Sequence, residues 1–291
     1  MQMNKTDHEA MLKKRRPLVE RQEGATIPDP FRILEHLADC RWGLRIYAET
    51  DSTNTLLKAM AREGAAAGTV VVADRQTGGR GRMGRSFLSP GGMGVYLSAL
   101  IRPDCAPTEL MHLTCAVAVA MCDAVEKAFG FRPGIKWTND LVVGNRKLGG
   151  ILTELGLDPQ TGRVDHAVLG IGINCGQTEA DFDESIRSMA TSVRMVTGQA
   201  ADRERLIAEM IRALEAMDHV LLSSPSAILE RYRRDCITLG QDVSILRGDE
   251  VRHGRALDID AEGGLVVRYD SGETGTVTSG EVSVRGLYGY I

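Results

Sequence analysis

The chain has 291 residues, 43% of them hydrophobic and 25% charged, which is the composition of an ordinary globular protein. That length supports one large domain with a small one appended, and a core that needs no disulfide or metal. The formal net charge of −4 argues weakly against general nucleic-acid binding, which usually needs a basic surplus. The six cysteines form no CxxC pair, so we expect reduced, buried thiols rather than a zinc or thiol-redox site.

Residues 1–28 are expected to form a polar N-terminal tail, which contains the basic run Lys13-Lys14-Arg15-Arg16. The tail lacks the apolar core of a signal peptide, and we expect no stretch of the chain to span a bilayer. A basic run of this kind favours a solvated helix face or tail over a nucleic-acid or targeting patch. The prediction is a cytoplasmic protein with no DNA or membrane partner.

Residues 29–238 alternate between helical and strand patterns. The expected helices are 31–38, one that is capped by Ser52 or Thr53, 108–129, 201–222 and 227–236. The expected strands are 44–48, 69–73, 95–101, 135–137, 141–143, 149–157 and 166–174. Apolar residues nearly encircle the helix 108–129, which indicates that it packs deep against a sheet.

The pattern changes after Gly240, where short β-rich pieces alternate with Gly, Asp and Ser turns. Strands are expected at 243–246, 255–259, 265–269, 275–278 and 282–284, a spacing typical of a small barrel of about five strands. The predicted fold class is therefore α+β: a mixed sheet with helices on one face over 29–238, followed by a small β-domain over 239–291.

The segment 78–85, Gly-Gly-Arg-Gly-Arg-Met-Gly-Arg, is the first candidate site. Glycines let several backbone N–H groups converge on an anion, and arginines add forked donors suited to carboxylate or phosphate. It is neither a P-loop, because the Gly-Lys-Ser/Thr ending is missing, nor a dinucleotide fingerprint, because a strand follows instead of a helix. On its own, the segment is equally compatible with an exposed loop that binds no ligand or binds RNA nonspecifically.

Three further clusters of polar residues carry weaker signals. Residues 136–140, Lys-Trp-Thr-Asn-Asp, place a cation and a carboxylate between two short strands, where the alternative is a hairpin turn. Lys147 begins an apolar strand ahead of Gly149 and Gly150, and a strand-end lysine more often extends to solvent. Residues 51–54, Asp-Ser-Thr-Asn, form a helix N-cap with spare hydroxyl and amide groups for a polar ligand.

The order and spacing of these motifs, with Gln76 before the glycine-arginine loop and Gly-Ile-Gly-Ile-Asn at 170–174, resemble those of the biotin–protein ligases. The likeness covers about residues 44–174, and the tail after Gly240 is similar to the small SH3-like C-terminal domain of that family. Such ligases join biotin to ATP and release pyrophosphate. They hold biotinyl-5′-AMP and then transfer biotin to one lysine of a carboxyl-carrier domain of a carboxylase.

The resemblance implies a role for each matching residue. Lys147 and Arg82 would be catalytic, and both would also contact biotin. The other residues implied for biotin are Ser52, Thr53, Asn54, Gln76, Gly79, Arg80, Gly81, Gly149 and Gly150. The residues implied for ATP and the adenylate are Arg82, Arg85, Lys136, Trp137, Asn139, Asp140 and Asn174, with Asp140 also contacting Mg²⁺. Biotin and ATP are substrates, no tightly bound cofactor is expected, and a homodimer is an expectation from the family.

The chain departs from the family pattern at three positions: Met83 where arginine is common, Phe87 where tryptophan is common, and Thr138 where proline is usual. About thirty polar residues precede the catalytic region, too few for the winged helix-turn-helix domain of some members. We therefore expect a monofunctional ligase.

Two alternatives remain. A lipoate or octanoate ligase is disfavoured by the glycine-arginine loop and by the Lys-Trp-x-Asn-Asp run. A non-catalytic biotin sensor would need a binding module, for which the only candidate is the basic run at 13–16.

Overall fold

The computed structural model describes residues 18–20, 27–37, 40–247, 249–278 and 282–286. The basic run at 13–16 lies outside these residues. The described helices are α2 (Pro30–His36), α3 (Thr53–Arg62), α4 (Leu113–Phe129), α5 (Val193–Thr197), α6 (Arg203–Val220) and α7 (Pro225–Asp235), with short 3-10 helices η1 (Arg82–Gly84), η2 (Pro107–Leu110) and η3 (Glu179–Asp181). Each long helix matches an expected one to within a few residues.

Eight strands form a mixed sheet in the order β1-β2-β3-β4-β8-β7-β6-β5. They are β1 (Leu18–Glu20), β2 (Gly43–Thr50), β3 (Thr69–Gln76), β4 (Gly94–Ile101), β5 (Gly134–Lys136), β6 (Asp140–Val143), β7 (Arg146–Leu157) and β8 (Val164–Asn174). β1, β2 and β3 run parallel, and every other pairing is antiparallel. β1 lies within the expected polar tail, and its three residues extend the sheet beside β2.

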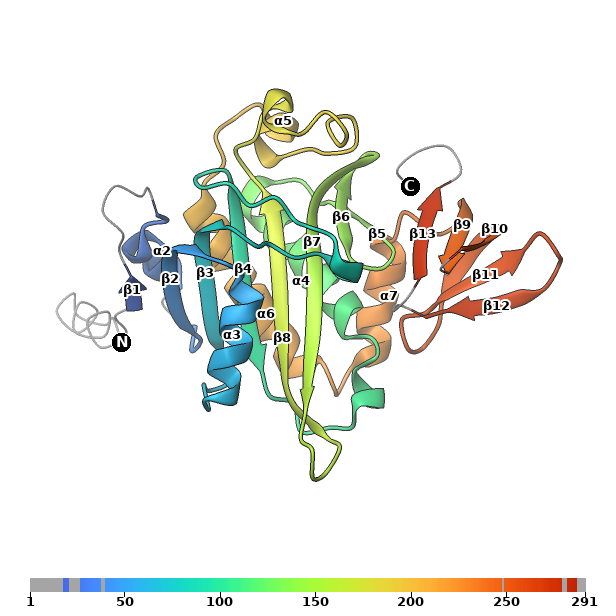
Figure 1. Cartoon of the computed structure of the whole chain (residues 1–291), viewed down its shortest axis with the longest axis horizontal. Helices are drawn as coiled ribbons and strands as arrows, with labels where there is room; N and C mark the ends of the chain where they lie inside the picture. Colours follow the sequence, from blue (N-terminus) through green and yellow to red (C-terminus); the bar gives the residue numbers. More distant parts are fainter. Residues whose placement is uncertain (1–17, 21–26, 38–39, 248, 279–281, 287–291) are drawn as a thin grey trace, which may run out of the picture.

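Most helices cover one face of the sheet, as expected. α4 is almost wholly buried between the sheet and α6 and α7 (Figure 1). α3 packs on the opposite face, through Leu57 and Met60 against Val71, Leu100 and Val168 of three neighbouring strands. The helices therefore lie on both faces, and α3 with the loop that follows β3 covers the second.

Five strands form the C-terminal antiparallel sheet, in the order β12-β11-β10-β9-β13. They are β9 (Asp242–Arg247), β10 (Glu250–Ile259), β11 (Leu265–Tyr269), β12 (Thr274–Val277) and β13 (Val282–Gly286). α7 contacts β10, and buried side chains of this sheet such as Val243 and Ala256 continue the main core. The five-stranded β-unit after residue 238 confirms the predicted layout.

The sequence was expected to contain no stretch long and apolar enough to span a membrane, and that expectation was wrong. Among the described residues the stretch Pro107–Phe129 is long and apolar enough to do so, and 72% of its apolar 18-residue window is buried inside the fold. The physical reason is that α4 is the central core helix, so sheet and helices surround its apolar side chains on all sides.

All six cysteines are free and buried, as predicted. Burial raises the pKa of the Cys115 and Cys175 thiols to about 12, which keeps them protonated and unreactive at neutral pH.

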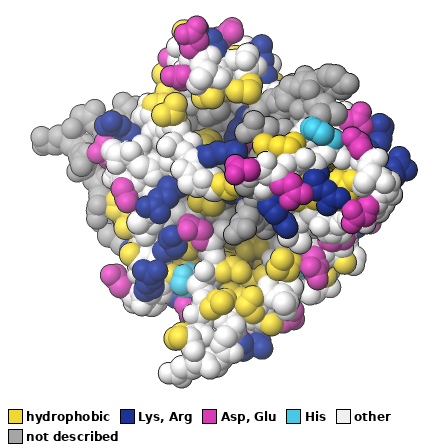
Figure 2. All heavy atoms as spheres, turned by 45° about the vertical axis from the view of Figure 1, so that its right-hand side comes forward, with side chains coloured by type: hydrophobic (Ala, Val, Ile, Leu, Met, Phe, Trp, Pro, Cys, Tyr) yellow, Lys and Arg dark blue, Asp and Glu magenta, His cyan; other side chains and the backbone are white. Residues whose placement is uncertain are grey.

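On the face shown in Figure 2, Lys and Arg side chains are interspersed with Asp and Glu.

Candidate functional site

A cavity of about 450 Å³ lies on the α3 side of the sheet. β8 contributes Gly170 and Gly172 to it, which share a face with Val168 because alternate residues of a strand point the same way. The residues that line the cavity are Ser52, Thr53, Asn54, Gln76, Arg80, Gly81, Arg82, Met83, Arg85, Ser86, Phe87, Lys136, Trp137, Asn139, Asp140, Lys147, Gly150, Ile151, Leu152, Gly170, Ile171, Gly172 and Met189. The motifs recognised in the sequence thus meet in one place.

One end of the cavity is built around the N-terminus of α3. Ser52 is its N-cap, as predicted, with its hydroxyl accepting from Thr55 N. The Thr53 backbone N–H and hydroxyl both donate to Gln76 Oε1, at 2.8 and 3.1 Å. Gln76 Nε2 donates in turn to Ser89 Oγ, at 2.9 Å. This end therefore offers neutral, preorganised polar groups.

The Asn54 carboxamide is held on three sides. Its Nδ2 donates to Leu152 O at 3.2 Å and to Glu154 Oε2 at 2.9 Å, while its Oδ1 accepts from Ser98 Oγ at 2.6 Å. Gly170 lies beneath it, where a Cβ would fall 2.1 Å from Asn54 Oδ1. Asn54 thus joins α3 to β4, β7 and β8, and both of its N–H donors are used within the protein.

The glycine-arginine loop is a narrow, hairpin-like loop that folds over the sheet. Its two sides are joined by hydrogen bonds from Phe87 N to Gly79 O and from Gly81 N to Arg85 O, at 2.9 and 2.7 Å. A Cβ at Gly79 would lie 2.3 Å from Phe87 O, so only glycine fits there. Met83 at the tip is 56% exposed and has a φ of 56°. This value lies in the left-handed region of backbone conformation, which residues other than glycine and asparagine rarely adopt.

Arg82 ties this loop to the opposite wall of the cavity. Its Nη1 donates to Asn139 Oδ1 at 3.1 Å, and Asn139 Nδ2 donates to Ile151 O at 2.9 Å. Among the described residues the buried Nη2 atom of Arg82 has no hydrogen-bond partner. Burial lowers the pKa of Arg82, and Asp140 opposes that effect, so the guanidinium stays charged while its Nη2 group is unused.

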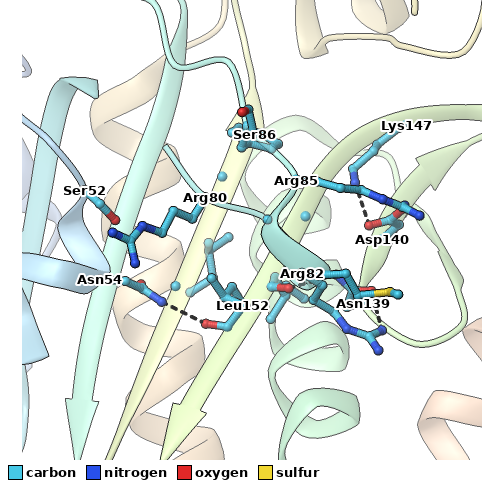
Figure 3. Close-up of a pocket in the computed structure, with 18 of the residues that line it drawn as sticks. Ser52, Asn54, Arg80, Arg82, Arg85, Ser86, Asn139, Asp140, Lys147 and Leu152 are labelled. Carbon is cyan, nitrogen blue, oxygen red and sulfur yellow. Dashed lines mark hydrogen bonds and ion pairs between the residues drawn. The ribbon is translucent and has the colours of Figure 1, made fainter. Parts of the chain in front are cut away.

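The other end of the cavity is charged. Lys147 Nζ lies 2.7 Å from Asp140 Oδ1, and the Lys147 backbone pairs with a second segment, donating to Met189 O and accepting from Thr191 N. Figure 3 shows Arg80 reaching towards Ser52 and Asn54, whereas Lys147 and Asp140 lie at the opposite side of the pocket. Lys147 belongs to β7, which begins at Arg146, three residues earlier than expected.

Three predicted site residues do not line the cavity. Gly79 and Gly149 lie behind it: a Cβ at Gly149 would be 2.4 Å from Gly172 O, so this glycine permits close packing of β7 on β8. Asn174 is buried, donates to Thr191 O at 3.0 Å and accepts from Gln177. It holds the segment that carries Met189 and does not face the cavity.

Several lining residues carried no clear signal in the sequence. Ile151, Leu152 and Ile171 are ordinary strand residues whose exposure to the cavity depends on strand register. Ser86 belongs to the loop but has no special chemistry. Met189 comes from the irregular region between β8 and α5, and it reaches the cavity through the pairing of residues 189–191 with Lys147, which no local pattern indicates.

No group of three or more His, Cys, Asp or Glu able to hold a metal occurs among the described residues. Within the part of the chain that the structure describes, Asp140 is the carboxylate that lines the cavity. One carboxylate is compatible with Mg²⁺, which proteins commonly hold through one or two carboxylates together with substrate phosphates. A metal ion at this site would therefore have to arrive with a phosphate ligand.

Comparisons with known proteins agree on one family. The chain matches the model of the biotin/lipoate A/B protein ligase family over residues 47–174 and that of the biotin protein ligase C-terminal domain over residues 238–285. It is 33% identical over 267 residues to the bifunctional ligase/repressor BirA of Bacillus subtilis, covering 87% of this chain and 80% of the relative.

The chain is also 33% identical over 245 residues to the biotin--[acetyl-CoA-carboxylase] ligase of Mycobacterium tuberculosis, covering 82% of this chain and 88% of that one. Among solved structures, the biotin protein ligase of Aquifex aeolicus in complex with biotin and ATP aligns with a TM-score of 0.71 at 29% identity, covering 84% of this chain and 98% of that chain. The chain belongs to the biotin protein ligase family.

Proposed function

We propose that this protein is an ATP-dependent biotin–protein ligase that forms biotinyl-5′-AMP in the cavity and transfers biotin to one lysine of a carboxyl-carrier domain. The observation that carries this is the polarity of the cavity. Neutral donors and acceptors of Ser52, Thr53 and Gln76 gather at one end, which the Arg80 guanidinium also reaches, whereas Lys147 and Arg85 lie at the other end beside Asp140. Biotin has the matching shape: a neutral ureido ring at one end and a carboxylate at the other.

The residue roles follow from that orientation. Ser52, Thr53, Gln76 and Arg80 surround the ureido ring, and the apolar side chains of Phe87, Leu152 and Ile171 contact the carbon skeleton. Lys147 contacts the biotin carboxylate and the α-phosphate. Arg82, Arg85, Lys136, Trp137 and Asn139 bind the nucleotide, and Asp140 contacts its Mg²⁺.

The first step joins two anions. A biotin carboxylate oxygen forms a bond to the α-phosphorus of ATP while the bond from that phosphorus to the bridging oxygen breaks, and pyrophosphate leaves. The carboxylate is already ionised at neutral pH, so no general base is required. Lys147 and Arg82 supply positive charge where negative charge gathers, and the loop keeps water from the mixed anhydride.

In the second step the neutral amine of the carrier lysine attacks the acyl carbon. A C–N bond forms, the bond from the acyl carbon to the AMP oxygen breaks, and AMP leaves with its phosphate charge; the amine proton passes to solvent. The loop must open or shift for the lysine to enter. Arg82, which joins the loop tip to Asn139, is the contact that would have to yield.

The remaining expectations rest on this activity. A carboxylase carrier domain is the macromolecular partner, the compartment is the cytoplasm, and a homodimer is a prediction that light scattering on the purified chain would test. The chain is proposed to act as a ligase without repressor activity. Its net charge of −4 and the mixed charges on the face in Figure 2 support the absence of DNA binding.

The activity is tested by exchange of labelled pyrophosphate into ATP. We expect exchange that depends on biotin and is absent with lipoate or octanoate. Exchange with lipoate alone would replace the proposal with a lipoate ligase, which the shared biotin/lipoate family model also covers. Lack of exchange with any of these acids, together with tight biotin binding, would point to a sensor.

A further inference from the structure

The cavity wall formed by Trp137 is supported by the C-terminal sheet. Trp137 lines the cavity and is only 5% exposed. Its backbone N–H donates to Thr238 Oγ1 at 2.9 Å, and its indole Nε1 donates to Gly263 O at 3.0 Å. Thr238 follows α7 at the junction of the two sheets, and Gly263 lies in the turn between β10 and β11. Both partners therefore come from outside the large sheet.

The turn that presents the Gly263 carbonyl is rigid. Asp260 Oδ1 accepts from Glu262 N at 2.9 Å and from Gly264 N at 2.8 Å, and Asp260 N donates to Gly264 O. Gly263 has a φ of +87°, and a Cβ there would fall 2.9 Å from Cys115 Sγ of α4. The turn is thus fitted against the core helix, with its carbonyl aimed at the indole.

The same wall is fixed from two further directions. Tyr232 of α7 donates its hydroxyl to Thr138 O at 3.1 Å. Ile237 N donates to Ile135 O at 2.9 Å, so the chain that leaves α7 runs beside β5. The segment that carries Lys136, Trp137 and Asn139 is therefore held between the large sheet and the C-terminal unit.

We propose that the turn 260–264 of the C-terminal sheet sets the nucleotide side of the site by positioning Trp137, with Gly263 and Thr238 as positioning residues. This inference rests on the proposed ligase function. Asn139 and Asp140, which follow Trp137 closely in the chain, lie away from Ser52 at the α3 N-terminus (Figure 3), so the turn should affect ATP and leave biotin unaffected. The C-terminal unit is then part of the ATP site without contacting ATP.

The test compares two turn glycines of the same sheet. Gly263→Ala adds a Cβ against Cys115, whereas Gly272→Ala adds one at the same φ of +87° in the turn after β11, where no atom lies within 4 Å. Both variants therefore impose similar backbone strain, and they differ in contact with the core. KM values for ATP and for biotin are measured by pyrophosphate exchange on the full chain, each at saturating levels of the other substrate.

Gly263→Ala should raise the KM for ATP about tenfold, the value of roughly one lost hydrogen bond, with the KM for biotin unchanged. Gly272→Ala should keep both wild-type values. Combining Gly263→Ala with Cys115→Ala removes the obstructing sulfur and should restore most of the ATP affinity. A Gly263→Ala enzyme that keeps its KM for ATP, or loses affinity for both substrates equally, overturns the inference.

A second pair of variants covers the case in which Gly263→Ala does not fold. Thr238→Val removes the hydroxyl that accepts from Trp137 N and should raise the KM for ATP, while Thr238→Ser keeps the hydroxyl and the wild-type value. Equal KM values for these two variants count against the inference. If the wild-type chain itself shows no biotin-dependent exchange, the proposed function fails, and that outcome is distinct from a glycine or threonine variant that behaves as wild type.

Discussion

Gly170→Ala tests whether the α3 end of the cavity is held by the Asn54 carboxamide. The new Cβ would lie 2.1 Å from Asn54 Oδ1, and Asn54 cannot withdraw without losing its bonds to Ser98, Leu152 and Glu154. Two of these are neutral bonds, worth about 1 kcal/mol each, and the one to the carboxylate is worth about 2 kcal/mol. Since part of the network can relax, we expect a loss of about 3 kcal/mol of unfolding free energy.

The unfolding free energy is measured by urea denaturation, and the KM for biotin is measured alongside it. The KM for biotin should rise because a displacement of Asn54 shifts α3 and moves Thr53 with it. Gly43→Ala is the matched control: it is also a strand glycine, but no atom lies within 4 Å of the added Cβ, and its effect should stay within about 0.5 kcal/mol. In a double-mutant cycle, Gly170→Ala should cost nothing further once Asn54 is alanine. Fully additive losses would refute this reasoning, because they would place the clash elsewhere.

Three further predictions concern the charged groups. Lys147→Ala should nearly abolish adenylate formation. The stability measured by thermal melting should change by about 1 kcal/mol or less, because a partly exposed ion pair contributes little. An active Lys147→Ala enzyme would remove this lysine from the mechanism. Arg82→Gly removes the hydrogen bond between the loop tip and Asn139, so biotinyl-AMP should escape and label lysines of bystander proteins. Streptavidin blotting detects this labelling. If the variant retains biotinyl-AMP as the wild type does, another contact holds the loop closed. Burial would raise the pKa of Glu154, but hydrogen bonds from Lys58 and Asn54 outweigh it and the pKa is lowered. Its carboxylate therefore stabilises the fold above the unfolded pKa of about 4.3 and loses that effect as the pH falls through the lower folded value. Glu154→Gln should accordingly flatten the stability curve on the acid side, as followed by urea midpoints from about pH 3 to about pH 7, and an unaltered acid limb would show that Glu154 is not the titrating group.

The elements of the fold were predictable where local pattern and burial agree. The apolar residues on all sides of α4 and the β-branched run of β3 directly indicate that both elements are buried. β1 was missed because three residues form a strand only where β2 offers an edge. The apolar composition of α4 also satisfies the criterion for a membrane helix, and composition alone does not distinguish the core of a sheet protein from a lipid environment.

The candidate site was predictable as a set of motifs but only partly as geometry. The order of the motifs predicts Lys147 and Arg82 as site residues, and the structure places both at the cavity. The same order predicts Asn174 and Gly149 as site residues, yet they support neighbouring segments from behind the cavity. Met189 and Gly263 depend on contacts between residues far apart in the chain, which spacing along the sequence does not encode.

The most direct test of the central claim is the mass of a carboxyl-carrier domain after incubation with this protein, biotin, ATP and Mg²⁺. We predict a gain of one biotinyl group on a single lysine, dependent on ATP and lost with the Lys147→Ala variant. An unmodified carrier domain, or one that gains a lipoyl group from lipoate in its place, would contradict the account.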